Sequence, residues 1–104
     1  MTGKANHKTA TEQPCVIYKA WTNLITGEVE IVYETATSGR ILLEIFHCDG
    51  QIVKTIHSTF EVCGAHKVIW NGKDSSGTSM PNGVYTCRLI TQRASVSKQF
   101  ILAQ

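Results

Sequence analysis

The sequence predicts an all-β protein, an antiparallel β-sandwich of about seven short strands in one domain. Several short segments alternate apolar and polar residues with a period of two, which is typical of strands that bury one face. Turn-forming clusters of Gly, Asn, Asp and Ser recur roughly every ten residues between these segments. No segment has the 3.6-residue apolar period of an amphipathic helix. At 104 residues and 42% hydrophobic content, the chain can form one modest core.

The first 14 residues differ in composition from the rest of the chain. They are polar and rich in Thr, Lys, Asn and Gln, and have too little apolar surface to pack. We therefore expect a flexible polar N-terminal arm over residues 1–14 and an immunoglobulin-like sandwich domain over residues 15–104.

Seven strands are expected, over residues 15–21, 28–35, 41–48, 51–57, 66–70, 84–91 and 95–103. The first (CVIYKAW) is followed by a turn and has no obvious hairpin partner. The second (EVEIVYET) places Val29, Ile31 and Tyr33 inward and its glutamates outward.

The third and fourth strands meet at a strong hairpin signal. The third points Ile41, Leu43 and Ile45 to the core and Glu44 to water. Asp49-Gly50 between two apolar strands favours a tight primed turn, which needs positive φ at both central positions. Residues 58–65 are expected to be a connector with Gly64 as its pivot.

The segment around the polar loop 71–83 is the most informative part of the chain. Trp70 ends the strand before this loop and Tyr85 follows it, so both rings should fill the core end and hold the loop from below. The predicted core is Val29, Ile31, Tyr33, Leu43, Ile45, Val68, Trp70, Tyr85, Leu89 and Phe100. The predicted turn residues are Asp49, Gly50, Gly64, Gly72, Gly77 and Gly83.

Four cysteines stand at positions 15, 48, 63 and 87, and none forms a CxxC pair. An even count permits two disulfides in three connectivities. Buried free thiols are the simpler interpretation, since Cys87 lies on the apolar side of its strand and Cys48 ends another.

Two weak metal candidates deserve weighing. Cys63 and His66 could form half a zinc site, with His47 and Cys48 as the other half. A histidine that opens a strand more often bonds a backbone carbonyl.

Asn71 and Asp74 lie in a loop rich in oxygen ligands, as calcium loops do. Only one carboxylate is present there, and Asx-turns explain both residues more simply. We therefore expect no metal and no cofactor.

Several function classes lack their sequence features. The net charge is +2 and the basic residues form no stripe, so nucleic-acid binding is not expected. No apolar run approaches membrane-spanning length. No Gly-x-Ser-x-Gly elbow or activated cysteine is present, so an enzyme is not expected.

From about Glu28 onward the chain resembles the immunoglobulin-like module of the flagellar hook-capping protein. It also resembles the C-terminal modules of secreted bacterial proteins, including type IX sorting domains. The segments that carry the resemblance are LLEIFHCDGQIVKTI at 42–56, CGAHKVIWNGKDSSG at 63–77, PNGVYTCRL at 81–89 and KQFILAQ at 98–104. The Asn-Pro-Phe opening of many sorting domains is replaced by CVIYKAWTN, and cysteines stand at three positions that are usually apolar or small.

This resemblance implies a non-catalytic structural or docking module of a secreted or cell-surface assembly. Its partners would be a carrier domain, secretion machinery or copies of itself. Residues 1–14 lack the apolar core of a signal peptide, which leaves a cytosolic chain or one whose leader was removed.

Two alternatives stay open. A self-assembling subunit could use the N-terminal arm, the first strand and open sheet edges to form an oligomer or filament. A carbohydrate- or ligand-binding module could use Tyr18 and Trp21 as a platform, because Trp70 and Tyr85 are assigned to the core.

Overall fold

The computed structural model describes residues 14–104 and contains seven strands and no helix in that range. The arm predicted over residues 1–14 lies outside the described residues, apart from Pro14. The strands are β1 Cys15–Thr22, β2 Val29–Thr35, β3 Gly39–His47, β4 Ile52–Glu61, β5 Gly64–Trp70, β6 Gly83–Thr91 and β7 Ser95–Leu102. No helix that could cross a membrane occurs among residues 14–104.

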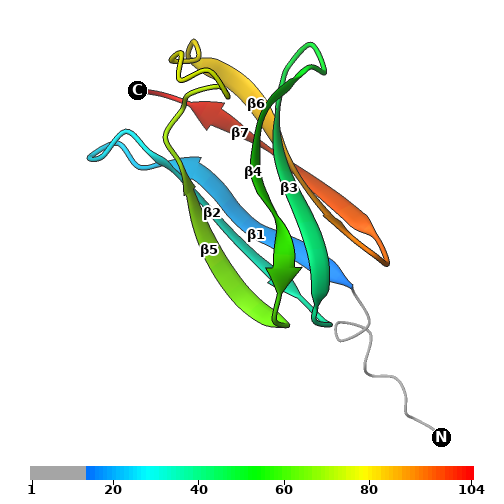
Figure 1. Cartoon of the computed structure of the whole chain (residues 1–104). Coiled ribbons are helices and arrows are strands. Elements are labelled where there is room, and N and C mark those ends of the chain that lie inside the picture. The colour runs from blue at the N-terminus through cyan, green and yellow to red at the C-terminus, as the bar shows by residue number, and fades with distance from the viewer. Residues whose placement is uncertain (1–13) are drawn as a thin grey trace, which may run out of the picture.

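The strands form two antiparallel sheets packed face to face (Figure 1). One has the order β1-β2-β5 and the other the order β4-β3-β6-β7. This arrangement of three strands against four confirms the predicted immunoglobulin-like sandwich of the fibronectin III type. The predicted first strand does have a hairpin partner, because β1 pairs with β2 from Cys15–Thr35 to Thr22–Val29.

The core lies between the two inner faces, as period-two alternation requires. The burial of β2 alternates without a break, and Val29, Ile31 and Tyr33 are fully buried. All the predicted core residues are buried except Val68, which is partly exposed and packs against the core from the edge strand β5. Cys15, Ile17, Ile41, Val53, Cys87 and Leu102 complete the buried cluster.

Three local expectations were wrong. The connector predicted over residues 58–65 is mostly strand, since β4 continues to Glu61 and β5 begins at Gly64. The hairpin expected at Asp49-Gly50 is present, but it is not a tight primed turn. It closes through a three-residue loop, with His47 N donating to Gln51 O (2.9 Å) and Gly50 at φ 93°. A turn followed by a left-handed glycine is the usual form of such a loop.

The third correction concerns Glu44, which was expected in water but is only 9% exposed. It lies on a central strand between Thr55 of β4 and Arg88 of β6. A residue flanked by strands on both sides is covered by its neighbours even on the outer face of a sheet.

The two sides of the sandwich differ. On one side β1 lies beside β7, and Thr22 links them: its Oγ1 donates to Ile101 O (2.7 Å) and accepts from Ala103 N (3.2 Å). On the other side, β4 and β5 are the outer strands of their sheets. A cleft of about 370 Å³ lies between them, lined by Lys54, Ile56 and Ile69 among others. One side is therefore closed by hydrogen bonds and the other is open.

Candidate functional site

The loop after β5 folds as a small, self-bonded hairpin. Asp74 N donates to Thr78 O (2.9 Å), and Met80 N donates to Gly72 O (2.8 Å). The Asp74 carboxylate accepts two backbone N–H groups through Oδ1, from Ser76 and Thr78, each at 2.9 Å. Such Asx-type bonds let one side chain shape a loop without a ligand.

Asn71 acts in the same way, since its Oδ1 accepts from Lys73 N at 3.0 Å. The two calcium candidates, Asn71 and Asp74, are therefore engaged with backbone amides. Within residues 14–104 no group of three or more His, Cys, Asp or Glu side chains is placed to hold a metal ion.

Trp70 and Tyr85 hold this loop from below. The Trp70 indole donates to Lys73 O (2.8 Å), and the Tyr85 hydroxyl donates to Pro81 O. The Trp70 ring meets Tyr85 edge-on at 5.6 Å and Phe100 at 6.1 Å between centroids. Both aromatic residues thus fill the core and use their polar atoms to fix a backbone carbonyl of the loop.

Gln104 connects the β1–β2 loop to the 71–82 loop. Its side-chain Nε2 donates to Gly27 O (2.8 Å) and Asn71 O (3.1 Å), and its backbone N donates to Asn82 Oδ1 (3.0 Å). Gly72 lies directly beneath, where a Cβ would stand 2.5 Å from Gln104 Nε2. No sequence pattern near Gln104 predicts this role, because its partners are far away along the chain.

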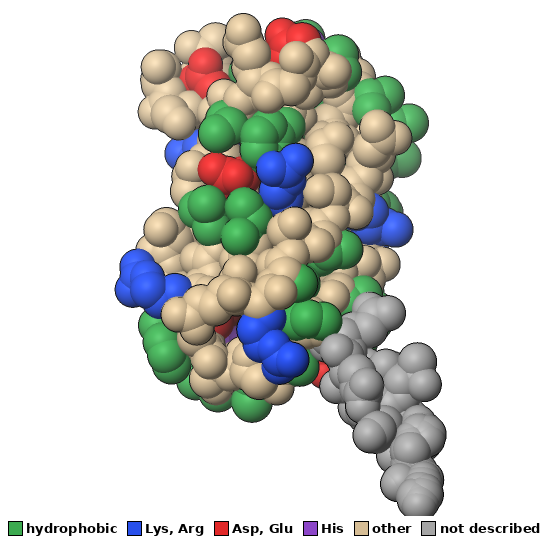
Figure 2. All heavy atoms as spheres, turned by 90° about the vertical axis from the view of Figure 1, so that its right-hand side faces the viewer, with side chains coloured by type: hydrophobic (Ala, Val, Ile, Leu, Met, Phe, Trp, Pro, Cys, Tyr) green, Lys and Arg blue, Asp and Glu red, His purple; other side chains and the backbone are tan. Residues whose placement is uncertain are grey.

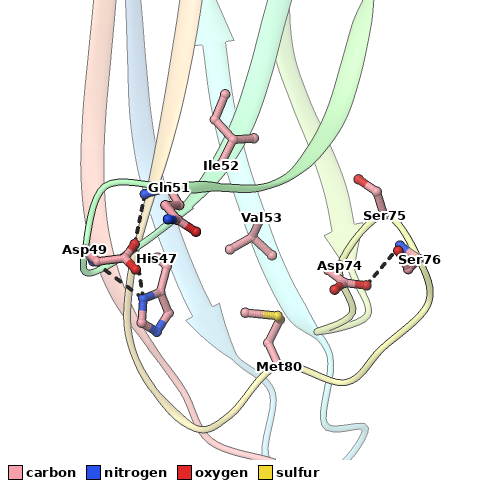
Figure 3. A pocket seen from close by; sticks show the side chains of 9 residues that line it. All are labelled: His47, Asp49, Gln51, Ile52, Val53, Asp74, Ser75, Ser76 and Met80. Carbon is pink, nitrogen blue, oxygen red and sulfur yellow. Dashed lines mark hydrogen bonds and ion pairs between the residues drawn. The ribbon is translucent and has the colours of Figure 1, made fainter.

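A cleft of about 440 Å³ separates the β3–β4 hairpin from the 71–82 loop (Figure 3). His47 and Asp49 stand on the hairpin side, and Asp74 stands on the loop side (Figure 3). The remaining lining residues are Gln51, Ile52, Val53, Ser75, Ser76 and Met80.

The carboxylates of this cleft have partners within the chain. Asp49 accepts Gln51 N (2.9 Å) and lies 3.4 Å from His47 Nδ1, and the Gln51 bond is the main reason that the pKa of Asp49 is lowered. Asp74 accepts the two loop amides described above. At the rim of the cleft the exposed thiol of Cys48 lies 3.7 Å from His47 Nδ1.

The two halves of the zinc candidate are not brought together. His47 ends β3 and Cys48 follows it, at the end of the sandwich that carries the 71–82 loop. Cys63 lies between β4 and β5 and His66 lies within β5, both at the opposite end. His66 Nε2 donates to Val62 O (2.7 Å), and its Nδ1 lies 3.2 Å from a carboxylate oxygen of Glu61. The ring bonds a backbone carbonyl, as expected, although His66 is the third residue of β5 and not its first.

Tyr18 and Trp21 both lie exposed on the outer face of β1. The Tyr18 hydroxyl donates to Glu34 (2.6 Å), which raises its pKa, and Trp21 Nε1 donates to Glu30 (3.4 Å). Lys19 Nζ lies 4.5 Å from the Trp21 ring centroid. Tyr18 and Trp21 thus share a face, as a binding platform would need, but the Lys19 ammonium covers one side of the Trp21 indole.

All four cysteines are free, and two of them are exposed. Cys15 and Cys87 are buried, and burial raises the pKa of Cys87 to about 11. The expectation of four buried thiols was wrong for Cys48 and Cys63, since both lie in turns between strands rather than on an inward face.

Comparison with known proteins agrees with this architecture. The basal-body rod modification protein FlgD of Salmonella typhimurium is 34% identical over 61 residues, which is 54% of this chain and 26% of that protein. FlgD of Salmonella typhi matches to the same extent. The chain thus spans about a quarter of these relatives.

Solved structures show the same fold at lower identity. FlgD of P. aeruginosa superposes with a TM-score of 0.63 at 22% identity, covering 85% of this chain and 72% of that one. FlgD of Xanthomonas campestris gives 0.57 at 22%, covering 86% and 62%. PorZ of Porphyromonas gingivalis gives 0.57 at 16%, covering 99% of this chain and 13% of that one.

The family match fits the strand pattern as well as the fold. Residues 20–95 match the family described as the FlgD Ig-like domain, a range that begins within β1 and ends at the start of β7. It confirms the resemblance to the hook-capping module. The chain belongs to the FlgD Ig-like domain family.

Proposed function

We propose that this domain is a non-catalytic docking module of a secreted or cell-surface protein assembly. One observation carries the proposal: the family match spans most of the sandwich, while the matched region is only 26% of the Salmonella relative. In that relative the region is one part of a longer protein. The carboxylates of the loop-end cleft are occupied by the chain's own donors, which agrees with a binding role rather than catalysis.

Two of the similar proteins support the proposed location. FlgD of Xanthomonas campestris is described as a hook-capping protein essential for flagellar assembly, and PorZ as a bacterial surface component of the type IX secretion system. We infer that this chain likewise works in an exported assembly, through protein surfaces and without a cofactor.

In vivo cross-linking tests this function. A photo-reactive amino acid placed at Ile25, which is 95% exposed at the tip of the β1–β2 hairpin, should capture protein components of an exported assembly. The same group at Thr91, the last residue of β6 at the opposite end of the sandwich, serves as the position control. Recovery of the chain only in the cytosol, with no cross-linked protein at either position, would contradict the proposal.

Self-assembly through the arm is a second candidate, and the open side of the sandwich favours it. β5 is an outer strand with a regular register along its whole pairing with β2, and it carries no proline. A regular outer strand can accept an added strand. We propose that residues 1–13 or β1 of one chain contact another in this way.

Deleting residues 1–13 tests the second candidate. The deletion keeps Pro14, whose carbonyl accepts from Ala36 N (3.0 Å), so the melting temperature should stay nearly unchanged. Sedimentation should show weaker association than in the full chain. If the deletion unfolds the domain, the arm is part of its own sandwich; if both chains stay monomeric at high concentration, assembly through the arm is wrong.

A further inference from the structure

The outer face of the β4-β3-β6-β7 sheet carries several apolar side chains, and no layer formed by residues 14–104 covers it. Phe46 pairs with Ile52 on one side and Thr86 on the other, and Leu42 pairs with Ile90. Directly paired residues project from the same face of a sheet, so Phe46 with Ile52 and Leu42 with Ile90 form two short apolar rows, which continue into the polar residues Thr86 and Ser58. Figure 2 looks onto this face and shows hydrophobic side chains on both sides of an adjacent acidic and basic side chain.

The outer faces of the two sheets differ in whether their acidic side chains have partners. On the β1-β2-β5 sheet, Glu30 accepts from Asn23 (3.1 Å) and Trp21 (3.4 Å) and lies 3.6 Å from Lys67 Nζ. The bond from Asn23 is the main reason that the pKa of Glu30 is lowered. The acidic residues of that face thus have their own partners within the chain.

Glu44 has no such partner. It projects between the two apolar rows, because Leu43 and Ile45 on either side of it are fully buried in the core. Glu44 as a whole is 9% exposed, but among residues 14–104 its carboxylate oxygens are not buried atoms lacking a partner, so they keep contact with solvent. A carboxylate that keeps contact with solvent and has no cation bonded to it within these residues is open to a cation from outside the chain.

Arg88 is the basic residue beside Glu44 within the chain, but its side chain is directed toward Phe46. It pairs with Glu44 in the strand register, but its guanidinium lies 4.9 Å from the Phe46 ring centroid. Arg88 is exposed, so its donors point to solvent. The face thus presents an unpaired anion and an exposed cation side by side on neighbouring central strands.

We propose that this face binds a second copy of the chain about a twofold axis that runs along the strands, between β3 and β6. Such an axis places Glu44 of each copy opposite Arg88 of the other. A twofold interface uses the same patch twice, so it must be self-complementary, and an adjacent anion and cation meet that requirement. The same operation lays Leu42 of one copy over Ile90 of the other.

This contact differs from the docking role proposed above and does not depend on it. It uses the outer face of the four-stranded sheet, and leaves the loop end and the open side free. A dimer through this face could therefore still present two loop ends to another protein.

Charge reversal gives a sharp test on the full chain by sedimentation equilibrium, from micromolar to millimolar concentration. The wild type should dimerise. Glu44→Lys and Arg88→Glu should each weaken the dimer by about tenfold or more, because each puts like charges across the interface. An equimolar mixture of the two variants should recover wild-type affinity as a heterodimer, since the two substituted side chains then meet with opposite charges and the unchanged Arg88 meets the unchanged Glu44.

Matched controls separate this contact from general charge effects. Glu28→Lys and Arg93→Glu make the same charge changes at exposed turn positions and should leave association unchanged. If Glu44→Lys does not fold, Glu44→Gln removes the charge without adding one and should weaken the dimer as well. The proposal is overturned by a wild type that stays monomeric at millimolar concentration, by association that both reversals leave intact, or by folded single variants that do not pair when mixed.

Discussion

The two ends of the sandwich are built in different ways. The loop end carries segments 23–28, 48–51 and 71–82 together with Gln104, whereas the turn end carries the short connections 36–38, 62–63 and 92–94. At the loop end, side chains from the core and from Gln104 reach out to fix backbone carbonyls. At the turn end, the connections bond to themselves or to a neighbouring turn, as when Thr91 N donates to Ala94 O (2.8 Å) and Cys63 N donates to Ser38 Oγ (2.8 Å).

This difference shows how a small sandwich can carry a long loop without losing order. A tight turn is specified by its own few residues, but a loop of twelve positions needs fixed points supplied by other parts of the chain. Here Trp70 and Tyr85 supply them from below and Gln104 from above. The loop end should therefore lose stability when these contacts are removed, and the turn end should lose it when the part-buried Tyr33–Glu61 hydrogen bond is broken.

The largest effect is expected at Trp70, which is 1% exposed. Trp70→Ala should lower the free energy of unfolding by about 3–5 kcal/mol, because it leaves a cavity and removes the bond to the loop. Denaturant unfolding measures the change. Trp70→Phe keeps a core ring without the N–H donor and should fall in between; a Trp70→Ala protein that melts within a few degrees of wild type would remove the core assignment.

The next effect is expected at the turn end. The Tyr33 hydroxyl is bonded to Glu61 at 2.7 Å, and the Tyr33 residue is fully buried. Glu61→Ala should cost about 1–3 kcal/mol, because it leaves a buried hydroxyl without an acceptor.

A double-mutant cycle with Tyr33→Phe identifies the origin of that loss. Removing both polar partners should cost less than the two single changes added together. Additive losses would show that Tyr33 and Glu61 stabilise the turn end independently of their hydrogen bond.

A smaller effect is expected at Gly72. Gly72→Ala places a Cβ against Gln104 at a backbone φ of +81°, and should cost about 1–2 kcal/mol. Gly77→Ala is a matched control, with φ +86° and open space around the added carbon. The difference between the two variants measures the Gln104 contact, and equal losses would mean that Gln104 does not hold the loop.

The smallest effect on stability is expected at the exposed thiols, which lie one at each end. Cys48 and Cys63 should react quickly with a thiol reagent in the native protein, whereas Cys15 and Cys87 should react only after unfolding, and the pKa of Cys87 near 11 slows it further at neutral pH. Mass spectrometry counts the modified thiols. Capping the two exposed ones should leave the melting temperature unchanged, and an intact mass lower by two or four hydrogens would show disulfides instead.

The sequence was sufficient for the strands and the two-sheet arrangement, because alternation over β2 and turn residues are local signals. It could not show that Glu44 is covered, since that depends on which strands flank β3, or that Val68 is partly exposed, since that depends on β5 being an outer strand. The loop-end contacts of Gln104 join positions up to 77 residues apart, which no local pattern reveals. Cys48 was misplaced because the third strand was expected to include residue 48 and ends at His47, whereas burial of Cys63 was expected from its residue type alone.

The bonded side of the sandwich has a mechanical consequence. β1 and β7 lie side by side and run in the same direction, so Cys15 and Leu102 stand at opposite ends of a molecule 53 Å long (Figure 1). A pull between these two residues loads the β1–β2 and β6–β7 ladders and the Thr22 contacts in shear, along the strands. All of these bonds must then break together rather than one by one. This slows forced unfolding, so the domain can resist a pulling force along its strands.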